Sequence, residues 1–512
     1  MSGSRGEPAE ESFSSVADTK RLKHRVRSGT RTALVAQVAS QVVSFGVLAC
    51  LYRQLAPDDF GLIGMVLPVL LLLRNLSTMG LNVVTIQRRE ITAGQLSSVF
   101  WLNILLGAVA AAVAAGLAPL VARLYGGRQE LTLLTLALAG TSVAAAFGAQ
   151  HQALLERRMR WTWLAATRLM AQLAAGAAAV SAALAGWGVW SLVVQQYVEL
   201  LALASLFWYA EPWRPSGPRR GAAVTDLLAL GGFFSAANLM SFLTTNVDKV
   251  LVGAAFGPRA LGLYSQAFNL MMKPGYLLTT PLAGIMLPTL SRAAGQPAAY
   301  RELLVSFSRV ISVILFPAAA GLFVVAPEVM LLLGGPRWSA SGGMLSALAL
   351  ALFVQGFVNV AAYVFASAGR TARLLAGAGV LAGAMSAVTA AAVWYGRWRH
   401  LPVEQAVTLV AYGYSLGLTV LAVGYLAYCM RSVGLTAWTW SAPAARPLLA
   451  AVAMSAVVWG GRGWLLSMGT TSPAVTLALL VATGGIVYTA LAWPDVRWLH
   501  RQAREFPLAD NT

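Results

Sequence analysis

The chain has 512 residues, of which 58% are hydrophobic and only 11% are charged, and its mean hydropathy is +0.67. A soluble domain carries about 25% charged residues, so this composition excludes a soluble protein and is typical of a multi-pass membrane protein. Only Cys50 and Cys429 are present, and both lie in predicted helices. The cysteines therefore predict neither a disulfide framework nor a metal site.

Apolar stretches long enough to cross a bilayer as a helix, about 20 residues each, recur along the whole chain. They predict an all-α polytopic fold with about fourteen transmembrane helices. The predicted spans are 32–52, 60–86, 97–124, 131–154, 161–185, 188–209, 227–256, 260–290, 303–333, 343–368, 372–395, 406–430, 448–466 and 474–493. The first thirty residues are polar and contain no apolar core, so no cleaved signal peptide is predicted.

The net charge of +18 is explained by membrane topology. If the N-terminus is cytoplasmic, 24 basic residues fall in the cytoplasmic loops and tails and 8 fall in the opposite loops. Lysine and arginine gather on the cytoplasmic side of membrane proteins, so both termini are predicted to be cytoplasmic. Nucleic-acid binding is not needed to explain the charge. Arg397 and Arg399 fall on the minority side, so the distribution of basic residues fits this topology least well around the eleventh and twelfth spans.

A short internal repeat divides the chain. The segment LAPDDFGLI at 55–63 aligns without a gap on FGPRALGLY at 256–264, which matches Pro57 with Pro258 and Gly61 with Gly262. The same offset relates the first span to the seventh, so we predict two six-helix bundles in parallel repeat around a central cavity, with two further helices at the C-terminal end. The predicted segments are a cytoplasmic basic tail (1–30), the N-terminal bundle (31–215), the C-terminal bundle (216–431), two additional helices (432–495) and a cytoplasmic tail (496–512).

Two basic residues lie at the middle of predicted spans, where a charge is costly and normally faces a bundle interior or a cavity. Arg74 is central in the second span, and Lys273 is near the centre of the eighth, at almost the equivalent position of the repeat. Together they predict a pair of cationic groups, one in each bundle, that face an anionic substrate. The alternative is that each pairs with an internal carboxylate.

Among the other ionisable residues inside predicted spans, Asp248, Lys249 and Glu199 are candidates for a functional role. Asp248 and Lys249 are adjacent on a helix and point about 100° apart, so each needs an environment of its own, with Thr244 and Thr245 as candidate neighbours of the pair. Asp248 is predicted to bind a coupling cation or proton or to act as an ion-pair switch, or else to neutralise a nearby base. Glu199, central in the sixth span, is a candidate proton relay, or a partner of neighbouring glutamines.

The sequence lacks the motifs of common membrane-associated enzymes. It has no GxxxxGK[ST], no HExxH and no loop long enough for a soluble catalytic domain. We therefore predict a secondary transporter or flippase rather than an enzyme, with no cofactor except a coupling H⁺ or Na⁺ and with no metal site. A membrane-embedded sugar transferase or ligase remains the alternative from another class.

Several segments resemble the polysaccharide transport family of the multidrug/oligosaccharidyl-lipid/polysaccharide exporter superfamily. They are the NVDKVLVGAAFGPRALGLYSQ stretch that begins at Asn246, PTLSR at 288–292, FGLIGMV from Phe60, IQRREIT from Ile86 and GWGVWSLVVQQ from Gly186. The resemblance covers about residues 31–430 and implies a flippase of the bacterial inner membrane. Its substrate would be a polyprenyl-diphosphate-linked oligosaccharide for exopolysaccharide, O-antigen or capsule synthesis.

On this resemblance, alternating access would expose the sugar outside while Arg74, Lys273 and Lys249 hold the diphosphate, and Asp248 or Glu199 would couple the motion to a cation gradient. The implied partners are membrane lipids and a polysaccharide polymerase or glycosyltransferase. A multidrug/cation antiporter and a peptidoglycan-precursor flippase, both of the same superfamily, are the alternatives, since fourteen spans suit the latter.

Overall fold

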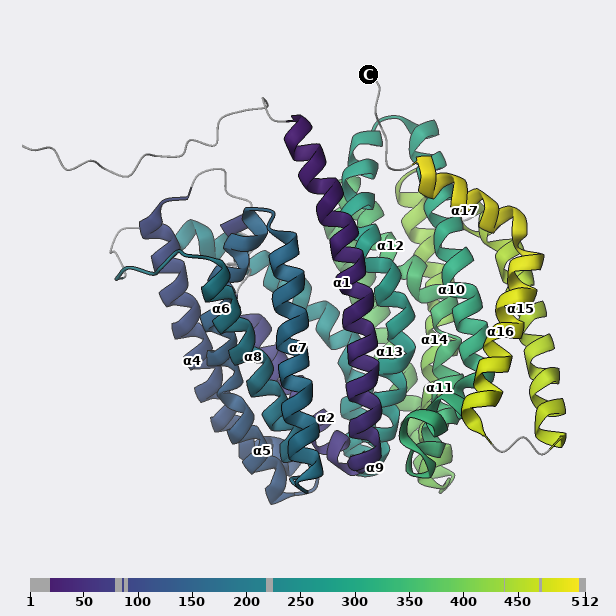
Figure 1. Cartoon of the computed structure of the whole chain (residues 1–512), viewed down its shortest axis with the longest axis horizontal. Helices are drawn as coiled ribbons and strands as arrows, with labels where there is room; N and C mark the ends of the chain where they lie inside the picture. Colours follow the sequence, from purple (N-terminus) through teal and green to yellow (C-terminus); the bar gives the residue numbers. More distant parts are fainter. Residues whose placement is uncertain are drawn as a thin grey trace, which may run out of the picture.

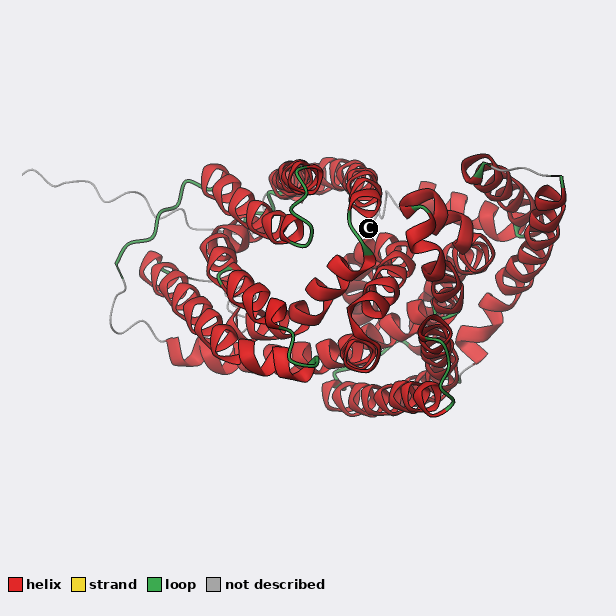
Figure 2. Cartoon of the chain, turned by 90° about the horizontal axis from the view of Figure 1, so that it is seen from below, coloured by secondary structure: helices red, strands yellow, loops and turns green. Residues whose placement is uncertain are grey.

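Figure 1 shows the computed structural model of the chain, which describes residues 19–78, 85–86, 91–217, 224–436, 438–468 and 472–505. Every regular element within these residues is helical, as Figure 2 also shows. The elements are α1 (Thr19–Gln54), α2 (Pro57–Thr78), α4 (Ala93–Leu124), α5 (Gln129–Ala139), α6 (Thr141–Arg157), α7 (Trp161–Leu184), α8 (Trp190–Ala210), α9 (Val224–Ala293), α10 (Pro297–Gly334), η1 (Pro336–Trp338), α11 (Ser339–Ala349), α12 (Leu352–Ser367), α13 (Thr371–Trp398), α14 (Val403–Ser432), α15 (Trp438–Ser467), α16 (Pro473–Leu491) and α17 (Trp493–Glu505).

The helices confirm a multi-pass membrane protein. Nine helices in the described part of the chain are long and apolar enough to cross a bilayer, and the number is eleven if each of two bent pairs counts as one span. The bent pairs are α1 with α2, at 118°, and the η1–α11 segment with α12, at 53°. α9 covers both the seventh and the eighth predicted spans, and α17 crosses the predicted boundary of the C-terminal tail at residue 496.

The helices form two groups on either side of α1 (Figure 1). α4 to α8 lie on one side and, together with α2, which packs on α4 and α5, they form the first group. α10 to α16 lie on the other side and form the second group with α9, which packs on α11, α12 and α13. α1 packs on α7 and also contacts α10. α2 runs against α9, and this is the most extensive contact between any two elements. Both halves of the chain therefore meet along α2 and α9 near the turn that joins α1 to α2, which we call the α1–α2 end.

The repeated motif of the sequence packs against itself at this end. A Cβ added to Gly61 would lie 1.8 Å from the carbonyl oxygen of Pro258, and a Cβ added to Gly262 would lie 1.9 Å from the carbonyl oxygen of Pro57. In each motif, the Cα of the glycine thus contacts the proline carbonyl of the other motif. Because no side chain fits in that space, the two glycines allow α2 and α9 to touch through their backbones.

α9 is interrupted where the sequence predicts the end of the seventh span. Gly257 has φ 85° and ψ −177°, while the residues on both sides remain helical. The predicted break is confirmed. However, ψ is extended rather than the value of a left-handed helical cap, and this region of φ/ψ space is open almost only to glycine.

Aromatic residues surround the α1–α2 end. Trp338 of η1 is fully buried, stacks on Tyr52 of α1 with ring centroids 4.3 Å apart, and donates a hydrogen bond from Nε1 to the Tyr52 carbonyl at 2.9 Å. Phe60 of α2 meets both rings edge-on. Tyr52 also donates from its hydroxyl to Oε1 of Gln266, at 3.0 Å. These contacts join α1 and α2 to η1 and α9, so the two groups of helices are held together at this end.

The C-terminal helices are attached to α10 by two ion pairs. Arg462 of α15 lies 2.6 Å from the carboxylate of Glu328, and Arg309 of α10 lies 2.5 Å from that of Asp495 in α17. Arg309 also lies 4.6 Å from the ring centroid of Trp498. Both carboxylates are buried and would be costly to leave without a counter-charge. α15 to α17 are thereby tied to the second group of helices.

Replacing Gly61 or Gly262 by alanine should disrupt the contact between the two motifs. The new methyl group would overlap a backbone carbonyl that cannot rotate away, and overpacking of this kind costs about 1–3 kcal/mol. We expect a lower apparent Tm for the full-length protein in detergent.

Gly116→Ala in α4 is the control, because nothing lies within 4 Å of a Cβ added at Gly116. It should leave Tm unchanged or slightly raised, since alanine is the better helix former. Equal Tm values for all three variants would contradict the proposed backbone contact.

Candidate functional site

A polar pocket lies between four helices of the first group. It has a volume of about 360 Å³ and is lined by residues of α2, α4, α6 and α8. The lining residues are Arg74, Asn75, Asn103, Ser142, Ala145, Ala146, Gly148, Ala149, Gln152, Gln196, Glu199, Leu200, Leu203, Ala204 and Phe207. Small residues of α6 leave the space open, and long polar side chains of the other helices border it.

Arg74 and Glu199 bring opposite charges to this pocket. Both are half-buried, and their charges attract one another. The sequence singled out both residues but predicted no relation between them. The structure agrees with one of the alternatives for Arg74, an internal carboxylate nearby, and it also places the guanidinium in a pocket wall. The two roles are compatible, since one carboxylate does not satisfy the five N–H donors of a guanidinium.

Asp248 lies elsewhere, in the interior of α9. It is 4% exposed, and its Oδ2 accepts a hydrogen bond of 2.8 Å from the hydroxyl of Tyr264. Tyr264 follows the break at Gly257 and Asp248 precedes it, so this bond joins the two segments of α9 across the break. Lys249 has contacts of its own, since its Nζ lies 3.4 Å from Oδ1 of Asn246 and 4.6 Å from the ring centroid of Phe268, but its charge also interacts with that of Asp248. The side chains of Thr244 and Thr245, the neighbours that the sequence suggested, lie outside the described residues.

Lys273 links the second group of helices to α1. Its Nζ donates a hydrogen bond of 2.7 Å to Oγ of Ser44 and lies 5.6 Å from the ring centroid of Phe45. Neither Lys273 nor Lys249 is among the residues that line the pocket around Arg74. The structure therefore brings together Arg74 and Glu199, and separately Asp248 and Lys249, while Lys273 lies at a third place.

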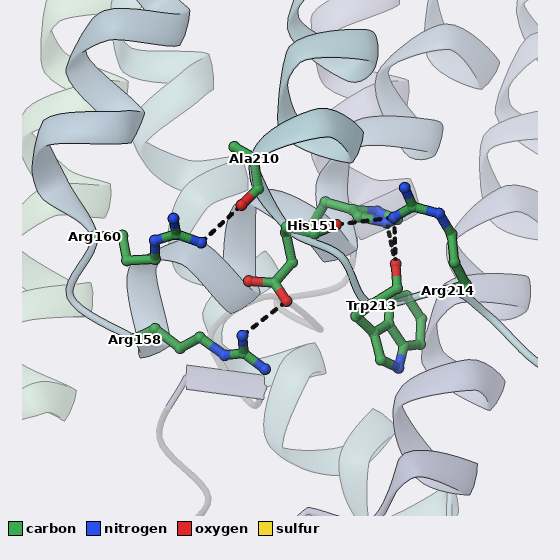
Figure 3. Close-up of polar contacts among 7 residues, drawn as sticks. His151, Arg158, Arg160, Ala210, Trp213 and Arg214 are labelled. Atoms are coloured by element: carbon green, nitrogen blue, oxygen red, sulfur yellow. Dashed lines mark hydrogen bonds and ion pairs between the residues drawn. The ribbon is translucent and has the colours of Figure 1, made fainter.

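A second cluster that sequence reasoning largely missed borders the same helices (Figure 3). His151 of α6 stacks on Trp208 with ring centroids 4.4 Å apart, and its Nε2 lies 3.1 Å from the carbonyl oxygen of Trp213. His151 therefore packs against α8 and the segment that follows it. Arg160 donates to the carbonyl of Ala210 at 2.7 Å, so the segment after α8 is held by its backbone against α6 and the α6–α7 turn.

The carboxylate of Glu211 is fully buried beside this cluster. Arg158, whose side chain is 47% exposed, lies 3.0 Å from it and is its ion-pair partner (Figure 3). The sequence did not predict this ion pair, because Glu211 lies just beyond a predicted span and its burial is a tertiary effect. The ion pair holds the end of α8, and with it the helix that carries Gln196 and Glu199.

An all-helical multi-pass membrane protein whose helices enclose a charged pocket has the architecture of a membrane transporter. The model of the family described as "Polysaccharide biosynthesis protein" matches residues 48–342, more than half of the chain. The chain therefore belongs to this polysaccharide biosynthesis family, which confirms the resemblance seen in the sequence.

Characterised relatives agree with this assignment. The chain is 26% identical over 490 residues to the succinoglycan biosynthesis transport protein ExoT of Rhizobium meliloti, a match that covers 91% of this chain and 93% of ExoT. It is 24% identical over 294 residues to the teichuronic acid biosynthesis protein TuaB of Bacillus subtilis, covering 57% of this chain and 61% of TuaB. The lipopolysaccharide biosynthesis protein WzxC of Escherichia coli is 26% identical, with 62% of this chain and 65% of WzxC covered.

Solved structures show the same fold at low sequence identity. The lipid II flippase MurJ in an inward closed conformation superposes with a TM-score of 0.69 and 13% identity over 91% of this chain and 98% of MurJ. A multidrug resistance MATE family transporter in an inward-facing conformation gives a TM-score of 0.62 and 14% identity over 78% of this chain and 98% of that one.

Removal of the charge at Arg158 should lower the stability of the first group of helices. Arg158→Met leaves a buried carboxylate without its counter-charge, and an unsatisfied buried group costs about 1–3 kcal/mol or more. We expect a lower apparent Tm in detergent. Arg128→Met is the control, since Arg128 is an exposed residue before α5 with no side-chain cap. Equal effects of the two substitutions would contradict a stabilising role for the pair.

Proposed function

We propose that the chain is a flippase that moves polyprenyl-diphosphate-linked oligosaccharide units across the bacterial inner membrane for the synthesis of a surface polysaccharide. Membership of the polysaccharide biosynthesis family and the match to a transport protein over 91% of the chain support this function. The observation that carries it is the pocket of Arg74, which offers a guanidinium and several amides inside a transporter fold. A guanidinium binds phosphate oxygens through paired hydrogen bonds.

In the proposed layout the chain has fourteen spans, with two six-helix bundles and two C-terminal helices. α9 then contributes two spans that meet at Gly257, and α1 and α2 contribute one span each. Both termini are cytoplasmic, which follows from the distribution of basic residues. The α1–α2 end is then the outer end, and the contact between the two Pro–Gly motifs closes it.

Alternating access follows from this closure. While the outer end is shut by backbone contact and the Tyr52–Trp338 stack, the substrate enters from the cytoplasmic side and its diphosphate binds Arg74. Opening requires α2 and α9 to part at Gly61 and Gly262. Lys273, bonded to Ser44 of α1, lies on the path by which the two groups separate and offers its cation to the lipid-linked diphosphate once that bond opens. Lys249 supplies a third cation in the same state.

Two carboxylates are proposed to couple this motion to a cation gradient. Glu199 faces Arg74, so a diphosphate that binds the guanidinium competes with it directly. Asp248 accepts the bond from Tyr264 that joins the segments of α9, and protonation of the acceptor would weaken that bond. The coupling ion is H⁺ or Na⁺. A polysaccharide polymerase or glycosyltransferase is the proposed partner.

The superposition on MurJ favours one second candidate, a flippase for a peptidoglycan precursor, because it extends over 98% of that protein. Complementation separates the two candidates. The gene should restore surface polysaccharide in a strain that lacks its polysaccharide flippase, and it should not restore viability to a strain depleted of its lipid II flippase. The reverse result would favour the second candidate.

Substitution of Arg74 and Lys273 tests the binding site in the same complementation assay. Arg74→Ala should lower polysaccharide output at equal protein level by about tenfold or more, since hydrogen bonds to charged groups contribute about 1.5–3 kcal/mol. Lys273→Ala should lower it as well. Arg168→Ala is the control, because Arg168 is largely exposed on α7 and does not line the pocket. Full rescue by both Arg74→Ala and Lys273→Ala would refute the diphosphate site.

A further inference from the structure

The pocket around Arg74 is unusually rich in amide side chains for a membrane interior. Asn75 of α2, Asn103 of α4, Gln152 of α6 and Gln196 of α8 all line it, one from each helix. Polar side chains within membrane-crossing helices are costly and are normally retained for function. Four amides that meet at one pocket therefore indicate that the pocket binds something that hydrogen-bonds.

Asn103 is the most informative of the four. It is 3% exposed, it lies in an apolar stretch of α4, and neither its Oδ1 nor its Nδ2 has a hydrogen-bond partner among the described residues. Ser142 of α6, another lining residue, is 2% exposed, and its Oγ also lacks a partner among those residues. Leucine and alanine would fill these positions without leaving polar atoms unsatisfied. Both residues therefore point to a ligand that supplies the missing partners.

The chemistry of these side chains restricts the ligand. A carboxamide offers two donors and an acceptor, and a serine hydroxyl offers both as well, which matches the hydroxyl and acetamido groups of a sugar. The lining also has an apolar part made of alanines, leucines and Phe207, which suits the carbon face of a sugar ring, but a hydrophobic drug would not need an amide from each of the four helices. A bare metal cation would favour several oxygen ligands such as carboxylates, whereas Glu199 is the one carboxylate in this wall and faces Arg74.

The size of the pocket restricts the ligand further. Small-molecule sites occupy about 300–1,000 Å³, and this pocket is near the lower limit. It suits one sugar ring rather than a whole oligosaccharide. The sugar nearest to a phosphate held by Arg74 is the one joined directly to the lipid diphosphate.

We propose that the pocket between α2, α4, α6 and α8 is a subsite for the sugar attached to the lipid diphosphate, and that Asn103 and Ser142 hydrogen-bond its hydroxyl or acetamido groups. This inference rests on the proposed flippase function and adds the part of the substrate that the pocket recognises. After a small rotation toward the pocket, the amide atoms of Asn103, which lack partners among the described residues, form hydrogen bonds to the sugar.

Short-chain lipid probes test this inference on the purified full-length protein in detergent. The probes are farnesyl diphosphate alone and farnesyl diphosphate linked to glucose, galactose or N-acetylglucosamine, and Kd is measured from the change in tryptophan fluorescence. At least one sugar-linked probe should bind wild type about tenfold more tightly than farnesyl diphosphate, a ratio that corresponds to about 1.4 kcal/mol. In Asn103→Leu and in Ser142→Ala this ratio should fall toward one.

Ser386→Ala is the matched control, because Ser386 lies on α13 outside the pocket and bonds to its own helix backbone. It should keep the wild-type ratio. If Asn103→Leu does not fold, Ser142→Ala decides the question by the same ratio.

The outcomes separate the inference from the function on which it rests. If farnesyl diphosphate binds wild type and Arg74→Ala weakens that binding, but none of the three sugars adds affinity or the variants keep the ratio, the sugar subsite is refuted and the diphosphate site stands. If farnesyl diphosphate does not bind, or binds Arg74→Ala equally well, the diphosphate site and the sugar subsite are both refuted.

Discussion

The structure depends on one reciprocal contact, in which Gly61 holds the carbonyl of Pro258 and Gly262 holds the carbonyl of Pro57. Backbone against backbone is the closest approach that two helices can make, and here it is possible because a glycine, which has no side chain, stands opposite each proline carbonyl. In a bilayer there is little hydrophobic drive between helices, so close packing of this kind must supply much of the attraction. The crossing of α2 and α9, the break at Gly257 and the burial of Trp338 are all arranged around it.

This contact closes the α1–α2 end of the molecule, where both halves of the chain meet. The aromatic residues at the closed end add area and a hydrogen bond, but they do so between side chains, which can rotate. The contacts of the two glycines differ in this respect, because a backbone carbonyl cannot rotate as a side chain does. It can leave the glycine Cα only if its whole helix moves. In the proposed alternating-access cycle, such a contact favours two discrete arrangements of the two groups of helices over intermediate ones.

The charged residues inside the membrane are divided among separate environments rather than gathered in one cavity. Arg74 and Glu199 face a pocket with amide walls, Asp248 is bonded across the break in α9, and Lys273 reaches α1. Each charge has polar neighbours, as the low dielectric of the interior demands. The bond of Lys273 crosses from α9 to α1, whereas the bond of Asp248 lies within α9 and the pocket of Arg74 lies within the first group of helices.

Much of the fold was predictable from the sequence, because the period and length of apolar stretches reflect the bilayer itself. The helical class, most helix positions and the break in α9 at Gly257 were of this kind. Two differences arose at helix ends. α1 begins at Thr19, well before the predicted start at residue 32, and α17 continues past the predicted end of the last span. Both segments are polar, and hydropathy marks only the part of a helix that lies within the apolar layer.

The candidate site was predictable only in part. A charged residue within an apolar stretch can be recognised from the sequence alone, because placing a charge in the membrane costs free energy. Five residues were singled out in this way: Arg74, Glu199, Asp248, Lys249 and Lys273. Asn103 and Ser142 are uncharged and were missed, although Asn103 stands out in the apolar segment WLNILLG. Which of these residues share a pocket could not be derived, since that depends on how α2, α4, α6 and α8 are rotated against each other.

The sequence by itself determined that this protein is a helical membrane protein built on a repeated Pro–Gly motif, because bilayer thickness and backbone geometry act on each segment locally. Only the tertiary structure decided that the two copies of the motif pack against each other and that Arg74 shares a pocket with Glu199 and a set of amides. Those relations depend on side-chain packing between helices far apart in the chain, and packing is a property of the assembled molecule.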